Sequence, residues 1–75
     1  MTEYQLAMIL KDMYQKGEVC REQTTMIHLF GIKYSSSIRD YGLSIKKILE
    51  YAQLPESYKT EINKGMKLSK YVVAK

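Results

Sequence analysis

The segment PESYKTEINKGMKLSKYVV, residues 55–73, decides the fold of this chain because it is compatible with two secondary structures. Tyr58, Thr60 and Ile62 alternate with charged side chains, as the inward residues of a half-buried strand do. The sequence NKG at residues 63–65 would supply a turn whose glycine can take a positive φ, and Met66 and Leu68 then alternate with polar residues on the way to YVV at 71–73. These features predict a β-hairpin.

The same segment also fits a helix. Pro55 would occupy the first helical position, and Glu56 would complement the positive end of the helix dipole. Tyr58 and Ile62 would then share one face, and Gly65 would close the helix. β-Branched and aromatic residues concentrate in this part of the chain, which favours the hairpin. We therefore predict the hairpin and keep the helix as the alternative.

Apolar spacing near the start of the chain predicts a first helix at residues 3–15. Thr2 and Gln5 have the spacing of a capping box. Apolar side chains then recur at i, i+3, i+4 and i+7, at Leu6, Ile9, Leu10 and Met13, before Gly17 stops the pattern. We expect Met8 and Met13 on this helix to pack in the core.

A second helix of about ten residues is predicted after a cap at Thr24 or Thr25, following a polar connector at residues 17–24. Helical spacing relates four of its residues, Ile27, Phe30, Gly31 and Tyr34. Gly31 is predicted to mark a close packing contact. Residues 37–42 should form a separate helical turn that Ser37 caps and Gly42 closes.

Ser44 is predicted to cap a third amphipathic helix. Its apolar face would consist of Ile45, Ile48, Leu49 and Ala52. The expected fold class is mostly α, with three to four short helices and a C-terminal β-hairpin, in the plan of a winged helix-turn-helix. Residues 1–75 are expected to form one small domain.

Size and composition narrow the classes of function. A chain of 75 residues has little core volume to give up to a pocket, so surface binding is favoured and no enzymatic activity is predicted. Cys20 and His28 are the only cysteine and histidine, which excludes an intramolecular disulfide and a zinc site of Cys/His type. The acidic residues are spread along the chain, so we predict no metal and no cofactor. A chain without an intramolecular disulfide fits a reducing setting, so we expect a cytoplasmic protein. The longest apolar run, residues 6–10, is too short to span a membrane.

The charge of the chain is unevenly distributed, and this asymmetry points to a polyanionic partner. Residues 1–32 carry a net charge of −1, whereas residues 33–75 carry +5. Five of the last seventeen residues are lysines. A basic surface of this kind supplies sequence-independent affinity for phosphate through counterion release. Double-stranded DNA is therefore the predicted partner.

The winged plan assigns different roles to the candidate DNA-binding residues. Lysines on the third helix and on the wing would contact phosphate, and these are Lys46, Lys47, Lys59, Lys64, Lys67 and Lys70. Residues with shorter or planar polar groups would contact base edges, and these are Ser35, Ser36, Arg39 and Gln53. A solvated basic surface that serves only solubility is the competing interpretation.

Three sequences, MIHLFGIKY at 26–34, SIKKILEYAQLPESY at 44–58 and EINKGMKLSKYV at 61–72, carry a family resemblance. The chain resembles a group of short bacterial proteins with a helix-turn-helix-like domain. The resemblance implies a bacterial or phage origin and a DNA-binding role in regulation, without assigning functional residues.

Residues 46–65 are also similar to the helix, turn and recognition helix of repressor-like domains. In that register Gln53 stands where the turn usually has glycine. The reading helix would begin at Glu56 and present four polar residues, Ser57, Lys59, Thr60 and Asn63.

A protein-interaction module that binds an acidic protein surface is the alternative function. Small size, five methionines and seven tyrosines favour an adaptable contact surface. The expected protein partners include a second copy of the chain, since a helix-turn-helix that reads a palindrome normally dimerises. Tyr51 and Tyr71 lie among lysines and are expected to be exposed.

Overall fold

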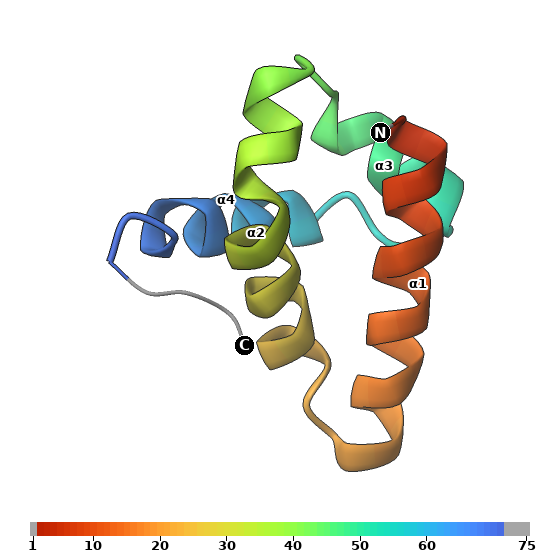
Figure 1. The fold of residues 1–75 in the computed structure, drawn as a ribbon. Helices are drawn as coiled ribbons and strands as arrows, with labels where there is room; N and C mark the ends of the chain where they lie inside the picture. Colours follow the sequence, from red (N-terminus) through yellow and green to blue (C-terminus); the bar gives the residue numbers. More distant parts are fainter. Residues whose placement is uncertain (1, 72–75) are drawn as a thin grey trace.

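Four helices, and the turns that join them, account for the chain in a computed structural model that describes residues 2–71. They are α1 (Glu3–Cys20), α2 (Gln23–Asp40), α3 (Ile45–Ala52) and α4 (Tyr58–Leu68). In Figure 1, α1 and α2 run in opposite directions and are joined at the bottom of the view, α3 packs against α1, and α4 crosses α2. None of the helices within residues 2–71 is long and apolar enough to cross a membrane.

The start of α1 confirms the predicted capping box. Thr2 Oγ1 accepts a hydrogen bond from the Gln5 backbone N–H at 3.1 Å, and Gln5 Oε1 accepts one from the Thr2 N–H at 2.9 Å. The predicted end near residue 15 is wrong, because α1 continues to Cys20. Gly17 lies inside the helix, where its bare backbone packs against Met26 and the turn before α2.

Three turns close α1, α2 and α3 in the same way. In each, one residue takes a left-handed conformation, with φ of 58° at Arg21, 61° at Gly42 and 61° at Gln53. The N–H that follows reaches back five residues, from Glu22 to the Gly17 carbonyl, from Leu43 to Ile38 and from Leu54 to Leu49. These are Schellman turns. Glycine suits the left-handed position best, yet two of the three positions hold long side chains.

The helix α2 is longer than predicted. Residues 37–40 continue it and do not form a separate turn, and its first residue, Gln23, precedes the predicted caps at Thr24 and Thr25. The buried face runs without interruption through Ile27, Phe30, Gly31, Ser35 and Ile38, so the end of α2 is held by the same core as its start. Gly42, which was predicted to close the separate turn, closes α2 itself.

Apolar side chains from all four helices form one core. Its buried members are Leu6, Ala7, Leu10, Ile27, Phe30, Ile38, Ile48, Leu49, Ala52 and Ile62. Met13 packs against this cluster as expected, whereas Met8 is 38% exposed, so its predicted place in the core is wrong. Tyr51 and Tyr71 are exposed, as predicted.

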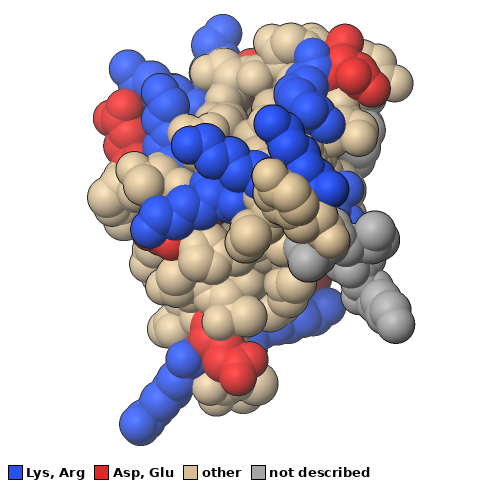
Figure 2. All heavy atoms as spheres, turned by 90° about the vertical axis from the view of Figure 1, so that its left-hand side faces the viewer, with Lys and Arg blue, Asp and Glu red and all other residues tan. Residues whose placement is uncertain are grey.

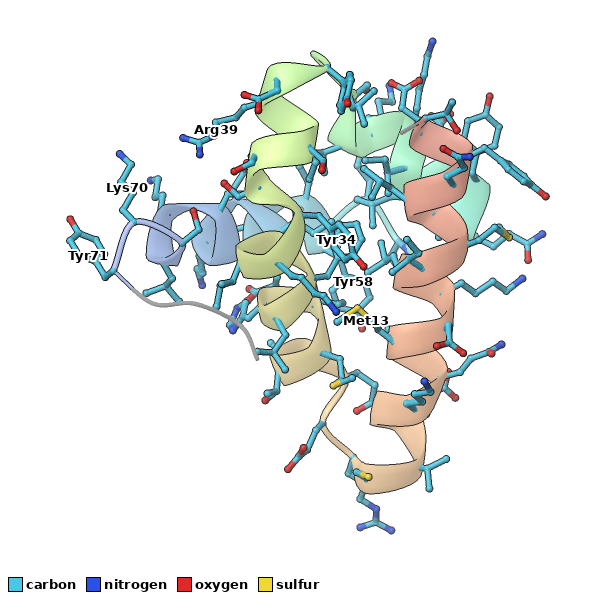
Figure 3. The ribbon with its side chains drawn as sticks, viewed as in Figure 1. Met13, Tyr34, Arg39, Tyr58, Lys70 and Tyr71 are labelled. Carbon is cyan, nitrogen blue, oxygen red and sulfur yellow. The ribbon has the colours of Figure 1, made fainter. Side chains whose placement is uncertain are left out.

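Polar contacts tie α1 to the second half of the chain. Ser44 caps α3 as predicted, since its Oγ accepts from the Lys47 N–H at 3.3 Å. Its own N–H donates to Glu3 Oε2 at 2.7 Å. The hydroxyls of Tyr14 and Tyr58 lie 3.2 Å apart, and this hydrogen bond raises the pKa of the Tyr14 phenol. In Figure 3 Tyr58 lies with Met13 and Tyr34 between α1 and α2.

The predicted β-hairpin and wing are wrong, because residues 58–68 form α4 and no strand occurs within residues 2–71. The alternative helix is correct in kind, although it begins at Tyr58 and passes through Gly65 to end at Leu68. The buried residues Ile62 and Gly65 are one helical turn apart, which a strand could not place on one face. The end of the expected second strand, Val72 and Val73, lies outside the described residues.

Gly31 of α2 and Gly65 of α4 set the separation of these two helices. Their Cα atoms are so close that a Cβ built on either glycine would lie 3.1 Å from the Cα of the other. A Cβ on Gly31 would also lie 2.5 Å from the Ile62 carbonyl oxygen, and one on Gly65 would overlap the carbonyl of His28. These obstacles are backbone atoms, which cannot rotate away. The predicted close contact at Gly31 is confirmed.

We expect Gly31→Ala and Gly65→Ala each to lower the free energy of unfolding by roughly 3 kcal/mol, because an added methyl would force α2 and α4 apart. Urea unfolding followed by far-UV circular dichroism measures this loss. Ser36→Ala, an exposed substitution on α2, is the control and should stay within about 0.5 kcal/mol of the parent. A Gly65→Ala variant as stable as this control would contradict the close crossing.

We expect Gln53→Gly to raise the free energy of unfolding by about 0.5 to 1 kcal/mol, since glycine takes the left-handed conformation without the cost that a Cβ adds. The reciprocal change, Gly42→Ala, should lower the free energy of unfolding by about the same amount. The added methyl would meet no atom within 4 Å, so the strain of the left-handed backbone is the only cost. Thermal and urea unfolding of both variants give the two signs. If both substitutions changed the free energy of unfolding in the same direction, the left-handed conformation of Gln53 and Gly42 would be contradicted.

Candidate nucleic-acid interface

The crossing of α4 over α2 leaves a groove on the side toward the C-terminal half of α2. This basic groove encloses about 380 Å³ and is lined by Ser35, Arg39, Asn63, Met66, Lys67 and Lys70. In Figure 3 Arg39 extends from α2 and Lys70 from the turn after α4, both on the same side of the molecule. Figure 2 shows the broad cluster of basic side chains on this face.

Three cations surround the basic groove, and their charge is not neutralised by neighbours. Arg39, Lys67 and Lys70 are all exposed, and none forms an ion pair with another residue of 2–71. Like charges around a concave surface concentrate positive potential there. An anion entering the groove would meet a guanidinium from one helix and ammonium groups from another.

Two serine hydroxyls join α2 to the end of α4 beside the basic groove. Ser69 Oγ lies 3.0 Å from Ser35 Oγ and 2.5 Å from the Met66 carbonyl oxygen. Ser69 can therefore donate to the carbonyl while it accepts from Ser35. Ser35 is only 2% exposed, so its role is to hold the turn that carries Lys70, and burial removes it from the base-reading candidates.

The outward face of α4 continues from the basic groove along the helix. Lys59, Asn63 and Lys67 follow one another at intervals of four residues and form a ridge, with Thr60 and Lys64 beside it. The two lysines of the ridge are exposed, and Asn63 is half-buried where the ridge meets the groove. The buried side of α4 is anchored by Ile62 and Gly65. The ridge is therefore held rigidly by the core.

The turn between α3 and α4 leads directly into the helix that carries this ridge. Gln53 closes α3 in the left-handed conformation that the repressor-like register assigns to glycine. Its side-chain oxygen accepts a hydrogen bond from Lys11 Nζ at 3.3 Å, which places Gln53 beside α1 and outside the basic groove. The polar residues that precede α4 are exposed, and α4 enters its first turn at Tyr58.

The structure brings together only part of the predicted site. Ser35, Arg39, Lys67 and Lys70 line the basic groove, and Lys59 and Lys64 belong to the outward face of α4. Ser36 is exposed on α2 but does not line the groove, and Lys46 and Lys47 are exposed on α3, outside its lining. The lysines assigned to the wing therefore lie on a helix and the turn that follows it.

Met66 and Ser69 were missed as parts of this site. In the predicted turn and strand of residues 63–70, Met66 and Ser69 would lie away from the other site residues. Helical spacing instead places Asn63, Met66 and Lys70 on one side of the chain. A count of apolar residues at intervals of three and four from Tyr58 would have found the helical period.

A second electrostatic contact between α2 and α4 lies on the other side of the crossing. His28 Nε2 lies 2.5 Å from Glu61 Oε2, and Lys64 Nζ lies 3.4 Å from Glu61 Oε1. The hydrogen bond from His28, with a smaller contribution from Lys64, holds the pKa of the Glu61 carboxyl below its ordinary value of 4.5. This pair reinforces the glycine contact.

We expect the contact between His28 and Glu61 to make the free energy of unfolding depend on pH in the acid range. Because the pKa of Glu61 is lower in the folded than in the unfolded protein, its contribution is complete above about pH 4.5 and disappears as the pH falls through the lowered value. Melting temperatures between about pH 3 and 7 should fall less steeply for Glu61→Gln than for the parent. Glu56→Gln, an exposed change before α4, should keep the parental slope. Parallel curves for Glu61→Gln and the parent would contradict the assignment.

The short helix α3, its turn and the basic helix α4 define a helix-turn-helix-like class of protein. The family model described as an HTH-like domain matches residues 2–75, and the chain belongs to this family. The searches of curated proteins and of solved structures found no match. Family membership suggests, at a coarse level, a DNA-binding regulatory role.

Proposed function

We propose that this protein is a small, non-enzymatic regulator or accessory factor that binds double-stranded DNA through α4 and the basic groove. The observation that carries the proposal is the continuity of the ridge on α4 with the cationic groove at its C-terminal end. A bacterial or phage setting, which rests on the family resemblance, and a cytoplasmic location, which rests on the composition of the chain, form part of the proposal.

Phosphate fits the basic groove. Arg39 offers a planar fork of donors that matches two phosphate oxygens, and Lys67 and Lys70 add mobile point charges. Contacts of this kind fix the orientation of a protein on a duplex without reading its sequence. The groove would therefore set how α4 approaches the DNA.

The outward face of α4 is the part suited to base contacts. A helix of this diameter enters the major groove, where the amide of Asn63 could donate to and accept from the edge of adenine. Thr60 lies one residue from Lys59 on the same exposed surface and offers a hydroxyl and a methyl group. The lysines of the ridge would contact the phosphates on either side.

We expect the double charge reversal Lys67→Glu and Lys70→Glu to weaken binding to every duplex sequence by about a hundredfold or more, because phosphate contacts carry no sequence preference. Fluorescence anisotropy with a labelled duplex between about 50 and 200 mM salt measures both affinity and salt dependence. The variant should also show a shallower salt slope.

Lys16→Glu with Arg21→Glu is the matched control, since it changes the net charge equally at two exposed positions, at the end of α1 and in the turn after it. Its affinity should fall far less than that of the Lys67 and Lys70 variant. Equal losses would mean that only net charge matters, and an absence of duplex binding by the parent at low salt would refute the proposed function.

A further inference from the structure

The crossing of α2 and α4 creates a second groove, on the side toward the N-terminal half of α2. This apolar groove encloses about 310 Å³ and is lined by His28, Lys64, Lys67, Leu68 and Tyr71. Lys67 lies on the dividing edge and lines both grooves. The two grooves therefore flank the C-terminal half of α4.

The floor of the apolar groove is chemically unlike that of the basic groove. Nearly all of its surface is apolar, and Leu68 and Tyr71 are 43% and 82% exposed. The floor itself offers a phosphate almost no hydrogen-bond donors, so it would contribute little to phosphate binding. An aliphatic or aromatic side chain would instead gain from burial there.

The rim of the apolar groove carries positive charge. The side chain of Lys64 is 59% exposed, and its Nζ lies 3.4 Å from Glu61 Oε1. Lys67 also lines the groove and is exposed. An ammonium group has three donors, so Lys64 can contact a further carboxylate. An apolar floor between lysines is complementary to an apolar side chain between acidic residues.

From this complementarity we propose that the apolar groove binds a short acidic segment of a partner protein, with an aliphatic or aromatic anchor on Leu68 and Tyr71 and carboxylates on Lys64 and Lys67. It goes beyond DNA binding, because it assigns a protein partner to a surface whose floor is apolar. Since Lys67 serves both grooves, the bound segment opposes duplex binding.

Selection of a random peptide library on the full chain tests the chemistry of the partner directly. We expect enriched peptides to share an aromatic or aliphatic residue flanked by Asp or Glu. The best peptide, synthesised with a fluorophore, should bind about tenfold more weakly to Leu68→Ser, which removes the apolar contact at the groove. Val19→Ser is the control, because Val19 is 86% exposed at the far end of α1 and should leave peptide affinity unchanged.

Duplex binding by the same variants separates this inference from the proposed function. Leu68→Ser should keep the duplex affinity of the parent within about twofold, whereas unlabelled peptide should displace duplex from the parent. Peptide binding with no duplex binding would refute the DNA proposal and leave this inference standing.

Four outcomes would overturn the inference. The first is an enriched set of peptides without acidic residues, and the second is equal peptide affinity of Leu68→Ser and the parent. The third is an equal loss of duplex affinity and peptide affinity in Leu68→Ser. The fourth is a dimer in sedimentation velocity that Leu68→Ser converts to a monomer. The third would assign the apolar groove to DNA, and the fourth would assign it to a second copy of the chain.

Discussion

The contact between Gly31 and Gly65 is the constraint on which the rest of this structure depends. Only hydrogen atoms on both Cα positions allow the backbones of α2 and α4 to meet, and the surrounding obstacles are carbonyl and amide atoms. Because the two helices cross at this point, the pair from His28 to Glu61 lies on one side and the hydroxyls of Ser35 and Ser69 lie on the other. Both polar contacts depend on the distance that the glycines set.

The same crossing organises the surface. A helix that crosses another leaves a recess on each side, and here the recesses are lined by different parts of α2. Toward Arg39 the lining is cationic and polar, and toward His28 it is apolar with a lysine rim. Lys67 lies between them, so one charged side chain couples two surfaces with different binding preferences.

Because residues 58–68 form a helix, the lysines in the last third of the chain can make contacts that a wing would not allow. On a wing, its lysines would lie at the end of a flexible hairpin and contact phosphate alone. On α4, Lys59, Asn63 and Lys67 form a ridge that Ile62 and Gly65 fasten to the core. Rigid support of this kind is what positions side chains for direct base contacts as well as phosphate contacts.

Local chemistry in the sequence by itself determined the capping box of Thr2 and Gln5, the cap at Ser44, the apolar face of α3 and the glycine at the end of α2, because these depend on neighbouring residues alone. The resemblance carried by its helical segments also identified the helix-turn-helix-like family. Tertiary structure decided the rest. Gly17 and Gly65, which resemble helix ends in sequence, lie inside helices because another segment packs against their bare backbone. Ser35 is buried and Arg39 joins Lys70 only because α4 crosses α2, a contact between residues far apart in the chain that no local pattern specifies.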